Sequence, residues 1–314
     1  METALINTAV KKTSGFKLRR TFRMYWMLYV MLAPVVLYYI IFCYLPMFGI
    51  VIAFKDYRPS RGILASQWVG FRHFTTYFNS IYFWRNVRNT LSINGLGLLF
   101  GFPAPILLAL LLNEAGNQRF KKTVQTITYM PHFISTVIVV SITMNFVSTQ
   151  GLINEVLGFM NLPPIRYSSD TSVFYPTYII SGIWQNIGWD SIIYLAALSG
   201  IDPQLYEAAT IDGAGRFQRI WHITLPGIAS TISIMLILRI GSIMSVGIEK
   251  IILMYSPGLY EVADVISTYV YRRGLQEGQM SFASAVGLFN SVINFIFVLS
   301  ADRLCKKLGQ SGLL

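Results

Sequence analysis

Residues 24–53 have the sequence MYWMLYVMLAPVVLYYIIFCYLPMFGIVIA, which contains no charged side chain. A helix needs about 20 apolar residues to cross the hydrocarbon core of a bilayer, whereas a strand of a membrane barrel alternates polar and apolar residues over about 10 positions. This run is long and continuous, so it predicts a membrane-spanning helix. Its apolar length is about twice that of a secretory signal core, and we therefore expect it to remain in the protein.

The whole chain has the composition of an integral membrane protein. Of its 314 residues, 54% are hydrophobic and 12% are charged, against about 25% charged residues in ordinary soluble domains. We expect an all-α integral membrane fold with six transmembrane helices, one for each apolar run. The six runs lie at 24–53, 89–112, 123–148, 173–200, 226–252 and 281–301.

The Lys and Arg residues predict how the chain is oriented. Cytoplasmic segments of membrane proteins are enriched in these residues, and the shorter segments on the side of the N-terminus hold the larger share of the 25 present. Both termini are therefore expected in the cytoplasm. The expected parts are a basic cytoplasmic N-terminus at 1–23, a first span at 24–53, an outer loop at 54–88, a core at 89–301 with a cytoplasmic loop at 201–225, and a cytoplasmic tail at 302–314.

Smaller patterns predict local structure within this plan. The outer loops contain segments with helical period near 71–82 and 152–160. Gly97 and Gly101 in the second span have the spacing of a small-residue contact between two membrane helices. We therefore expect short helices on the outer side and a close helix contact in the second span.

The net charge of +11 does not indicate a nucleic-acid-binding protein. The basic residues are scattered and no motif of a nucleic-acid-binding fold accompanies them, so we expect them to face anionic membrane lipid. No cluster of His, Cys and carboxylate residues predicts a metal site or an enzyme active site. No phosphate-binding loop of the form G-x-x-x-x-G-K-[ST] is present. Energy from ATP would therefore have to come from another protein.

The loop between the fourth and fifth runs has the clearest local pattern, EAATIDGAGRFQRIWHITLP at 207–226. Asp202 followed by Pro203 is typical of a helix start, Gly213 and Gly215 are typical of a helix end, and a second short helix is expected before Pro226 opens the fifth span. The Ala and Gly residues between 207 and 215 would let a partner's backbone approach closely. They are equally compatible with a compact turn against the chain's own helices.

This segment resembles the EAA loop of the permease subunits of binding-protein-dependent ABC importers. The preceding WQNIGWD at 184–190 and the GLINEVL at 151–157 also look like the sugar-uptake permeases related to the maltose importer, and the stretch from 247 to 275 is similar to the subset that imports oligosaccharides and polysaccharide fragments. Many members have another proline soon after the Leu-Pro pair, where this chain has Ser230. The matching positions of the loop are Glu207, Ala208, Ala209, Gly213, Ile223, Leu225 and Pro226.

The resemblance implies a fold, partners and a role for the loop. It implies the type I ABC importer permease fold in a bacterial inner membrane, a second homologous permease, two cytoplasmic ABC ATPases, an extracytoplasmic sugar-binding protein and an oligosaccharide substrate. ATP and magnesium would bind the ATPases, so no cofactor is expected in this chain. The ATPase-coupling surface would comprise Glu207, Ala208, Ala209, Asp212, Gly213, Ile223, Leu225 and Pro226.

Polar and ionisable residues inside the spans are the candidates for the substrate pathway. Such residues are energetically costly in lipid, so those that are present usually have a function. Asn186, Asp190 and Tyr194 share one face of the fourth span. A sugar site combines aromatic rings with amide and carboxylate hydrogen bonds. The candidates are Trp184, Gln185, Asn186, Trp189, Asp190, Tyr194, Arg239, Asn290 and Asn294.

Structural explanations for the same residues stay open at this point. Arg239 could pair with Asp190 and hold two helices together without touching substrate. Lys250 is better explained as interfacial or structural, and His132 as a neighbour of a helix kink at Pro131. The alternative function is a stand-alone secondary sugar transporter driven by an ion gradient, with Asp190 and Arg239 as the coupling pair. Such carriers usually have more spans and internal symmetry.

Overall fold

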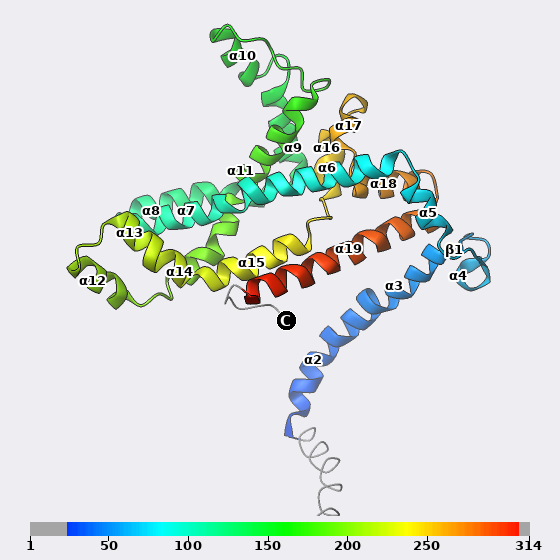
Figure 1. Cartoon of the computed structure of the whole chain (residues 1–314), viewed down its shortest axis with the longest axis horizontal. Coiled ribbons are helices and arrows are strands. Elements are labelled where there is room, and N and C mark those ends of the chain that lie inside the picture. The colour runs from blue at the N-terminus through cyan, green and yellow to red at the C-terminus, as the bar shows by residue number, and fades with distance from the viewer. Residues whose placement is uncertain (1–23, 308–314) are drawn as a thin grey trace, which may run out of the picture.

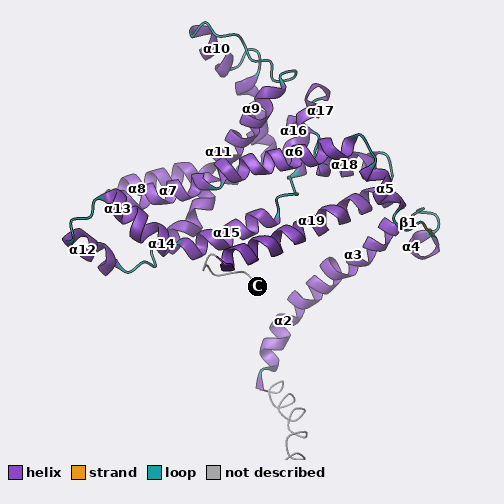
Figure 2. Ribbon diagram, viewed as in Figure 1, coloured by secondary structure: helices purple, strands orange, loops and turns teal. Residues whose placement is uncertain are grey.

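The computed structural model describes residues 24–307, and nearly all of its regular structure is helical (Figures 1 and 2). Its two short strands, β1 (Lys55–Asp56) and β2 (Gln67–Trp68), form an antiparallel pair in the first outer loop. The all-α prediction is confirmed. The predicted cytoplasmic N-terminus at 1–23 and the end of the predicted tail, 308–314, lie outside the described residues.

The first span is a helix over Trp26–Phe54, close to the prediction. It contains α2 (Trp26–Tyr38), a π-helical turn over Tyr39–Tyr44, α3 (Leu45–Met47) and a 3-10 segment over Phe48–Phe54. The helix diverges from the body of the molecule (Figure 1) and packs against α19 (Met280–Lys307) through its last segment. Almost all of its large apolar side chains are exposed on this chain.

The second span begins earlier than predicted. It contains α6 (Tyr82–Leu96), a π-helical turn over Gly97–Gly101 and α7 (Pro103–Glu114), so it starts at Tyr82 rather than at residue 89. The predicted outer loop 54–88 is therefore too long at its end, although it does contain the expected short helix as α5 (Arg72–Phe78). Arg85 lies in the part of this helix that precedes the predicted start. Arg85 is compatible with the helix because it forms an ion pair with Asp264.

The third span is broken where the sequence predicted one helix over 123–148. It consists of α8 (Gln118–Tyr129), a 3-10 turn over Met130–Phe133 and α9 (Thr136–Val147). Proline lacks an amide hydrogen and clashes with the preceding helical turn, so Pro131 explains the break. The outer loop that follows contains the expected helix as α10 (Leu152–Phe159), which projects from the body of the molecule (Figure 1).

The fourth and sixth spans are long single helices. The fourth is α11 (Thr171–Leu198), which starts at the N-cap Asp170, close to the predicted 173–200. The π-helical turn of the second span contacts α11, and Gly101 lies on that side, as its spacing predicted. The sixth span, α19, extends to Lys307 instead of ending at residue 301, so the predicted tail is helical in its first part. Asp302 and Lys306 pair at 2.9 Å one turn apart and support this extension.

The fifth span differs most from the prediction of one helix over 226–252. A helix over Arg216–Gly227 is bent by 62° from α15 (Ala229–Gly241), so Pro226 lies within a helix and does not begin one. Residues 242–247 then leave helical geometry before α16 (Ile248–Met254). By length and composition, four helices of residues 24–307 can cross a membrane, or five if the bent pair forms one span.

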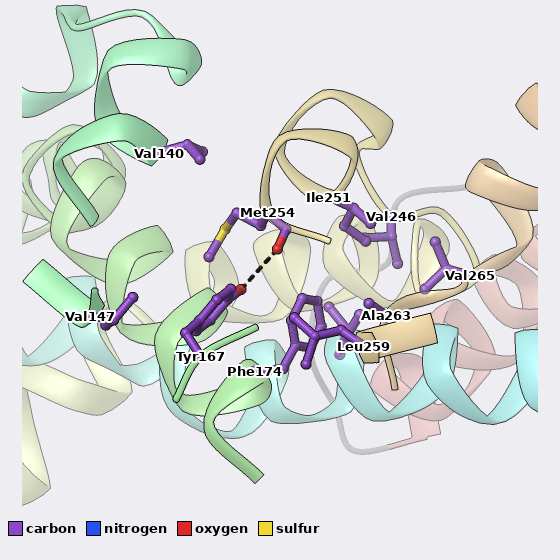
Figure 3. Close-up of a cluster of buried hydrophobic side chains, with 11 residues drawn as sticks. Val140, Val147, Tyr167, Phe174, Val246, Ile251, Met254, Leu259, Ala263 and Val265 are labelled. Atoms are coloured by element: carbon purple, nitrogen blue, oxygen red, sulfur yellow. Dashed lines mark hydrogen bonds between the residues drawn. The ribbon is translucent and has the colours of Figure 1, made fainter. Parts of the chain in front are cut away.

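The segment that follows this break, from Val246 to Val265, packs into a buried apolar cluster (Figure 3). Phe174 at the start of α11 lies beside Leu259 from the 3-10 turn Pro257–Leu259, and Tyr167 donates a hydrogen bond of 3.2 Å to the carbonyl oxygen of Met254. The helices α17 (Tyr260–Ala263) and α18 (Ile266–Tyr271) follow and lead into α19. The cluster therefore sets the position of the broken fifth span relative to α11.

Candidate functional site

The loop before the fifth span folds as the sequence predicted as far as Gly215, whereas the helix after it continues through Pro226. Asp202 caps α12 (Pro203–Ile211) by accepting a hydrogen bond of 2.9 Å from the amide of Gln204. Gly213 has φ of 78°, a left-handed conformation that glycine adopts without strain. The next helix begins at Arg216. The side chain of Gln218 caps its start by accepting a hydrogen bond of 2.7 Å from the amide of Gly215.

The surface of this loop is exposed and contains a small hollow of about 310 Å³. Of the predicted coupling residues, Ala209, Asp212, Gly213 and Ile223 line the hollow, while Glu207, Ala208 and Pro226 are exposed outside it. Leu225 instead packs against a buried cluster of the chain itself. The sequence analysis missed two bulky apolar side chains on this surface, Ile211 and Phe217, each 87% exposed. The presence of these two apolar residues in an otherwise polar loop could have indicated that they lie on a contact surface.

Two side-chain contacts connect α12 to the helix that enters the membrane. The hydroxyl groups of Tyr206 and Thr224 lie 3.1 Å apart, and Arg219 donates a hydrogen bond of 3.0 Å to the hydroxyl of Thr210. Two side-chain contacts therefore attach α12 to the helix Arg216–Gly227, which is the first part of the bent fifth span.

A second site is a cavity of about 560 Å³ among α6, the π-helical turn Gly97–Gly101, α11 and α15. Of the predicted pathway residues, those that line it are Gln185, Asn186, Asp190, Tyr194 and Arg239. Trp184, Trp189, Asn290 and Asn294 do not line it. Further polar lining residues that the sequence analysis did not select are Asn94, Tyr178, Ser242, Ser245 and Lys250.

The unwound segment 242–247 forms part of the cavity wall, and asparagine side chains hold it. Asn94 on α6 donates a hydrogen bond of 2.7 Å to the carbonyl oxygen of Ile243, and Asn294 on α19 accepts one of 2.9 Å from the amide of Met244. Asn290 and Asn294 also donate to the hydroxyl of Ser245. Backbone groups that leave a helix at membrane depth need such partners. Asn290 and Asn294 therefore support the break and do not face the cavity.

The cationic side chains of the cavity lie beside glycines. A methyl group on Gly97 would come within 3.3 Å of Arg239 Nη2, and one on Gly182 within 3.2 Å of Lys250 Nζ. Lys250 donates a hydrogen bond of 2.9 Å to the carbonyl oxygen of Tyr178 and lies 4.6 Å from the centre of that ring. The explanation of Lys250 as an interfacial residue is wrong, because it lines the cavity, whereas the explanation as a structural residue agrees with its hydrogen bond to Tyr178.

The suggested ion pair between Asp190 and Arg239 is not formed. Within residues 24–307 the ion pairs at 4.0 Å or less include neither side chain. The carboxylate of Asp190 and the guanidinium of Arg239 are therefore both available to bind a ligand in the cavity.

The two tryptophans of α11 lie outside the cavity. Trp184 and Trp189 are 43% and 44% exposed. The ring of Trp189 stacks on His132 with a centroid distance of 4.5 Å, and His132 Nδ1 lies 3.1 Å from Asn186 Oδ1. His132 thus lies in the turn after Pro131, as predicted, and links that turn to a cavity residue.

Comparison with known proteins identifies the family. Residues 101–310, more than half of the chain, match the family model described as Binding-protein-dependent transport system inner membrane component. The chain belongs to this family. The resemblance seen in the loop at 207–226 is therefore confirmed for the chain as a whole, and the fold is that of these permeases.

Two relatives of this permease are permease proteins of carbohydrate transport systems. It is 48% identical over 287 residues to the polygalacturonan/rhamnogalacturonan transport system permease protein YteP of Bacillus subtilis (strain 168), covering 91% of this chain and 89% of that protein. It is 28% identical to the arabinooligosaccharides transport system permease protein AraP of Halalkalibacterium halodurans, with coverage of 88% and 86%.

A solved structure shows the same fold. The chain is similar to one chain in the crystal structure of a bacterial alginate ABC transporter in complex with alginate pentasaccharide-bound periplasmic protein. The TM-score is 0.87 and the sequence identity 45%, and the similarity covers 95% of this chain and 100% of the other.

Proposed function

We propose that this chain is the permease subunit of an ATP-driven importer for oligosaccharides and that it forms half of the translocation pathway with a second, homologous permease. The observation that carries the proposal is the position of Tyr194. It lines the membrane cavity, and it is also buried in a cluster with Leu198 and Ile228, against which Ile220 and Leu225 pack. A movement of the exposed loop is therefore transmitted to the cavity wall through packed side chains.

The exposed loop is the proposed contact with the ATPase. Glu207, Ala208 and Asp212 face outward on α12 and the turn after it, and the hollow beside them accepts a side chain of the partner. ATP and magnesium would bind two cytoplasmic ATPase subunits, because the chain has no phosphate-binding loop. Closure of the two ATPases would then move α12 and, through the Tyr194 cluster, the helices around the cavity.

The proposed topology has six spans with both termini in the cytoplasm of a bacterial cell. It counts as spans the four apolar helices, α11, and the bent pair formed by the helix Arg216–Gly227 and α15. The loop with α12 and the strand pair β1–β2 lie at opposite ends of the long axis (Figure 1), which supports opposite sides of the membrane for them. The exposed first helix would face lipid and the second permease.

The saccharide substrate and the extracytoplasmic partner follow from the relatives. YteP is named for polygalacturonan and rhamnogalacturonan, and the alginate transporter was solved with a periplasmic protein that binds an alginate pentasaccharide. We infer a sugar-binding protein that delivers oligosaccharides to the outer side of this permease. A cavity with amide, hydroxyl, aromatic and charged groups suits a sugar ligand.

Reconstitution tests the proposal directly. The full chain is co-expressed with the candidate second permease and ATPase, placed in vesicles and supplied with the binding protein and labelled oligosaccharides. Uptake is expected to need ATP, the binding protein and every subunit. Uptake by this chain alone, driven by a proton or sodium gradient, would instead establish the alternative of a secondary transporter.

A further inference from the structure

We propose that the cavity binds the carboxylate groups of acidic oligosaccharides, with Arg239 and Lys250 as the two cationic ligands. The inference rests on the proposed function and adds to it the chemical class of the sugar. The charges of the cavity, the available hydrogen-bond donors of these two residues and the space beside them support this assignment.

The charge of the cavity favours an anion. Its ionisable lining groups are Arg239, Lys250 and Asp190, apart from tyrosines. This leaves one excess positive charge when all three are ionised. Charged residues within spans are unfavourable and normally pair with a partner or serve a function, and within residues 24–307 neither cation has a carboxylate within 4.0 Å. A bound carboxylate supplies the missing partner.

The donors of both cations are largely unused. Lys250 Nζ has three hydrogens and donates one bond, to the carbonyl oxygen of Tyr178. The guanidinium of Arg239 carries five donors in a planar fork, and no hydrogen bond joins it to another residue of the described chain. A planar fork fits the two oxygens of a carboxylate, and such charge-assisted bonds are stronger than neutral ones.

Glycines keep space open at both positions. A methyl group on Gly97 would lie 3.3 Å from Arg239 Nη2, and one on Gly182 would lie 3.2 Å from Lys250 Nζ. Larger residues would push the cations away from these walls. Asp190 on the same wall of α11 is suited to accept hydrogen bonds from sugar hydroxyl groups, so the cavity has distinct partners for the two kinds of group on an acidic sugar.

The test uses the reconstituted complex with its binding protein and compares two labelled substrates, trigalacturonate and the neutral trisaccharide obtained by reducing its carboxyl groups. Arg239→Gln and Lys250→Gln are expected to lower uptake of trigalacturonate about 10-fold or more and to leave uptake of the neutral sugar within about twofold. Arg239→Lys and Lys250→Arg, which keep the charge, should restore a large part of the acidic uptake. Arg273→Gln is the matched control, because Arg273 is a cation of the outer segment paired with Glu277 and does not line the cavity.

Direct binding makes the result independent of the binding protein's own selectivity. Equilibrium dialysis of trigalacturonate against the purified complex without binding protein should show binding that weakens with salt and is lost in the Arg239→Gln, Lys250→Gln double variant. Equal losses of uptake for both sugars, or unchanged binding of trigalacturonate in the double variant, would overturn the carboxylate proposal. The proposed importer function would still stand as long as the unmodified complex showed ATP-dependent uptake. If the unmodified complex transported no oligosaccharide at all, the proposed function would fail, and this inference with it.

Discussion

Arg85 Nη2 donates a hydrogen bond of 2.7 Å to Asp264 Oδ2 and so joins the start of α6 to the turn between α17 and α18. Asp264 is fully buried and also accepts hydrogen bonds from Arg272 and Thr268. This carboxylate is therefore the centre of a polar network that joins α6, α17 and α18.

Replacing Asp264 should destabilise the protein strongly. Asp264→Asn keeps the shape of the side chain but leaves two arginines around a neutral group, and removing one partner of a buried pair typically costs about 3 kcal/mol or more. Thermal unfolding of the detergent-purified protein measures the effect. Glu277→Gln, which breaks the exposed pair with Arg273, is the control and should cost less than about 1 kcal/mol. Equal stability of the two variants would contradict the role of Asp264.

Loss of the Glu207 carboxylate should uncouple transport from ATP hydrolysis. Glu207 is exposed on α12, and charge-assisted hydrogen bonds to a basic partner are worth about 1.5 to 3 kcal/mol. In the reconstituted complex, Glu207→Ala should keep membrane insertion but lose most of the ATPase stimulation and uptake. Glu249→Ala removes an exposed carboxylate away from the loop and should retain both activities. Full uptake by Glu207→Ala would rule out its coupling role.

The turn at Gly213 should tolerate no branched side chain. A residue such as valine at φ of 78° is strained by about 1 to 3 kcal/mol, so Gly213→Val is expected to change the angle between α12 and the next helix and abolish ATPase stimulation. Gly278, two residues before α19, has φ of 72° and provides a control with similar strain. If Gly278→Val impaired stimulation as much as Gly213→Val, strain alone would explain the loss.

The crossing of α8 and α11 should depend on Gly188. A Cβ atom at this position would collide with the backbone of Thr128, which cannot move as a side chain can. Gly188→Ala should therefore lower the unfolding temperature and reduce the yield of folded protein. Gly287 on α19 has open space at the same point, so Gly287→Ala should be neutral or stabilise by up to about 1 kcal/mol through helix propensity. Identical behaviour of both variants would show that the close approach is not required.

The break in the fifth span should need Asn294. Asn294→Leu leaves the amide of Met244 without its partner and removes a donor to Ser245, and an unsatisfied buried donor costs about 1 to 3 kcal/mol. We expect lower stability and lower uptake of every substrate, because the cavity wall moves. Asn294→Gln, which keeps the amide, should recover part of both. A selective loss for one substrate would instead indicate that Asn294 contacts sugar.

The local features were predictable because short-range rules determine them. The N-cap at Asp202, the left-handed turn at Gly213 and the kink at Pro131 each depend on residues within a few positions. The ends of the second and fifth spans were not predictable in this way. Arg85 lies in the helix of the second span and pairs there with Asp264, 179 positions later in the sequence.

The functional residues also divide into those that the local sequence predicted and those that only the tertiary structure revealed. The apolar runs determined the membrane class, and the loop pattern at 207–226 determined the family, since both are written in neighbouring residues. Only the tertiary structure decided that Arg239 and Lys250 share a cavity, that Trp184 and Trp189 lie outside it, and that Asn294 supports the backbone. Those outcomes depend on how helices rotate against one another and on a break held by Asn94, which bonds to Ile243 across 149 positions of sequence. Periodicity along one helix carries no information about such contacts.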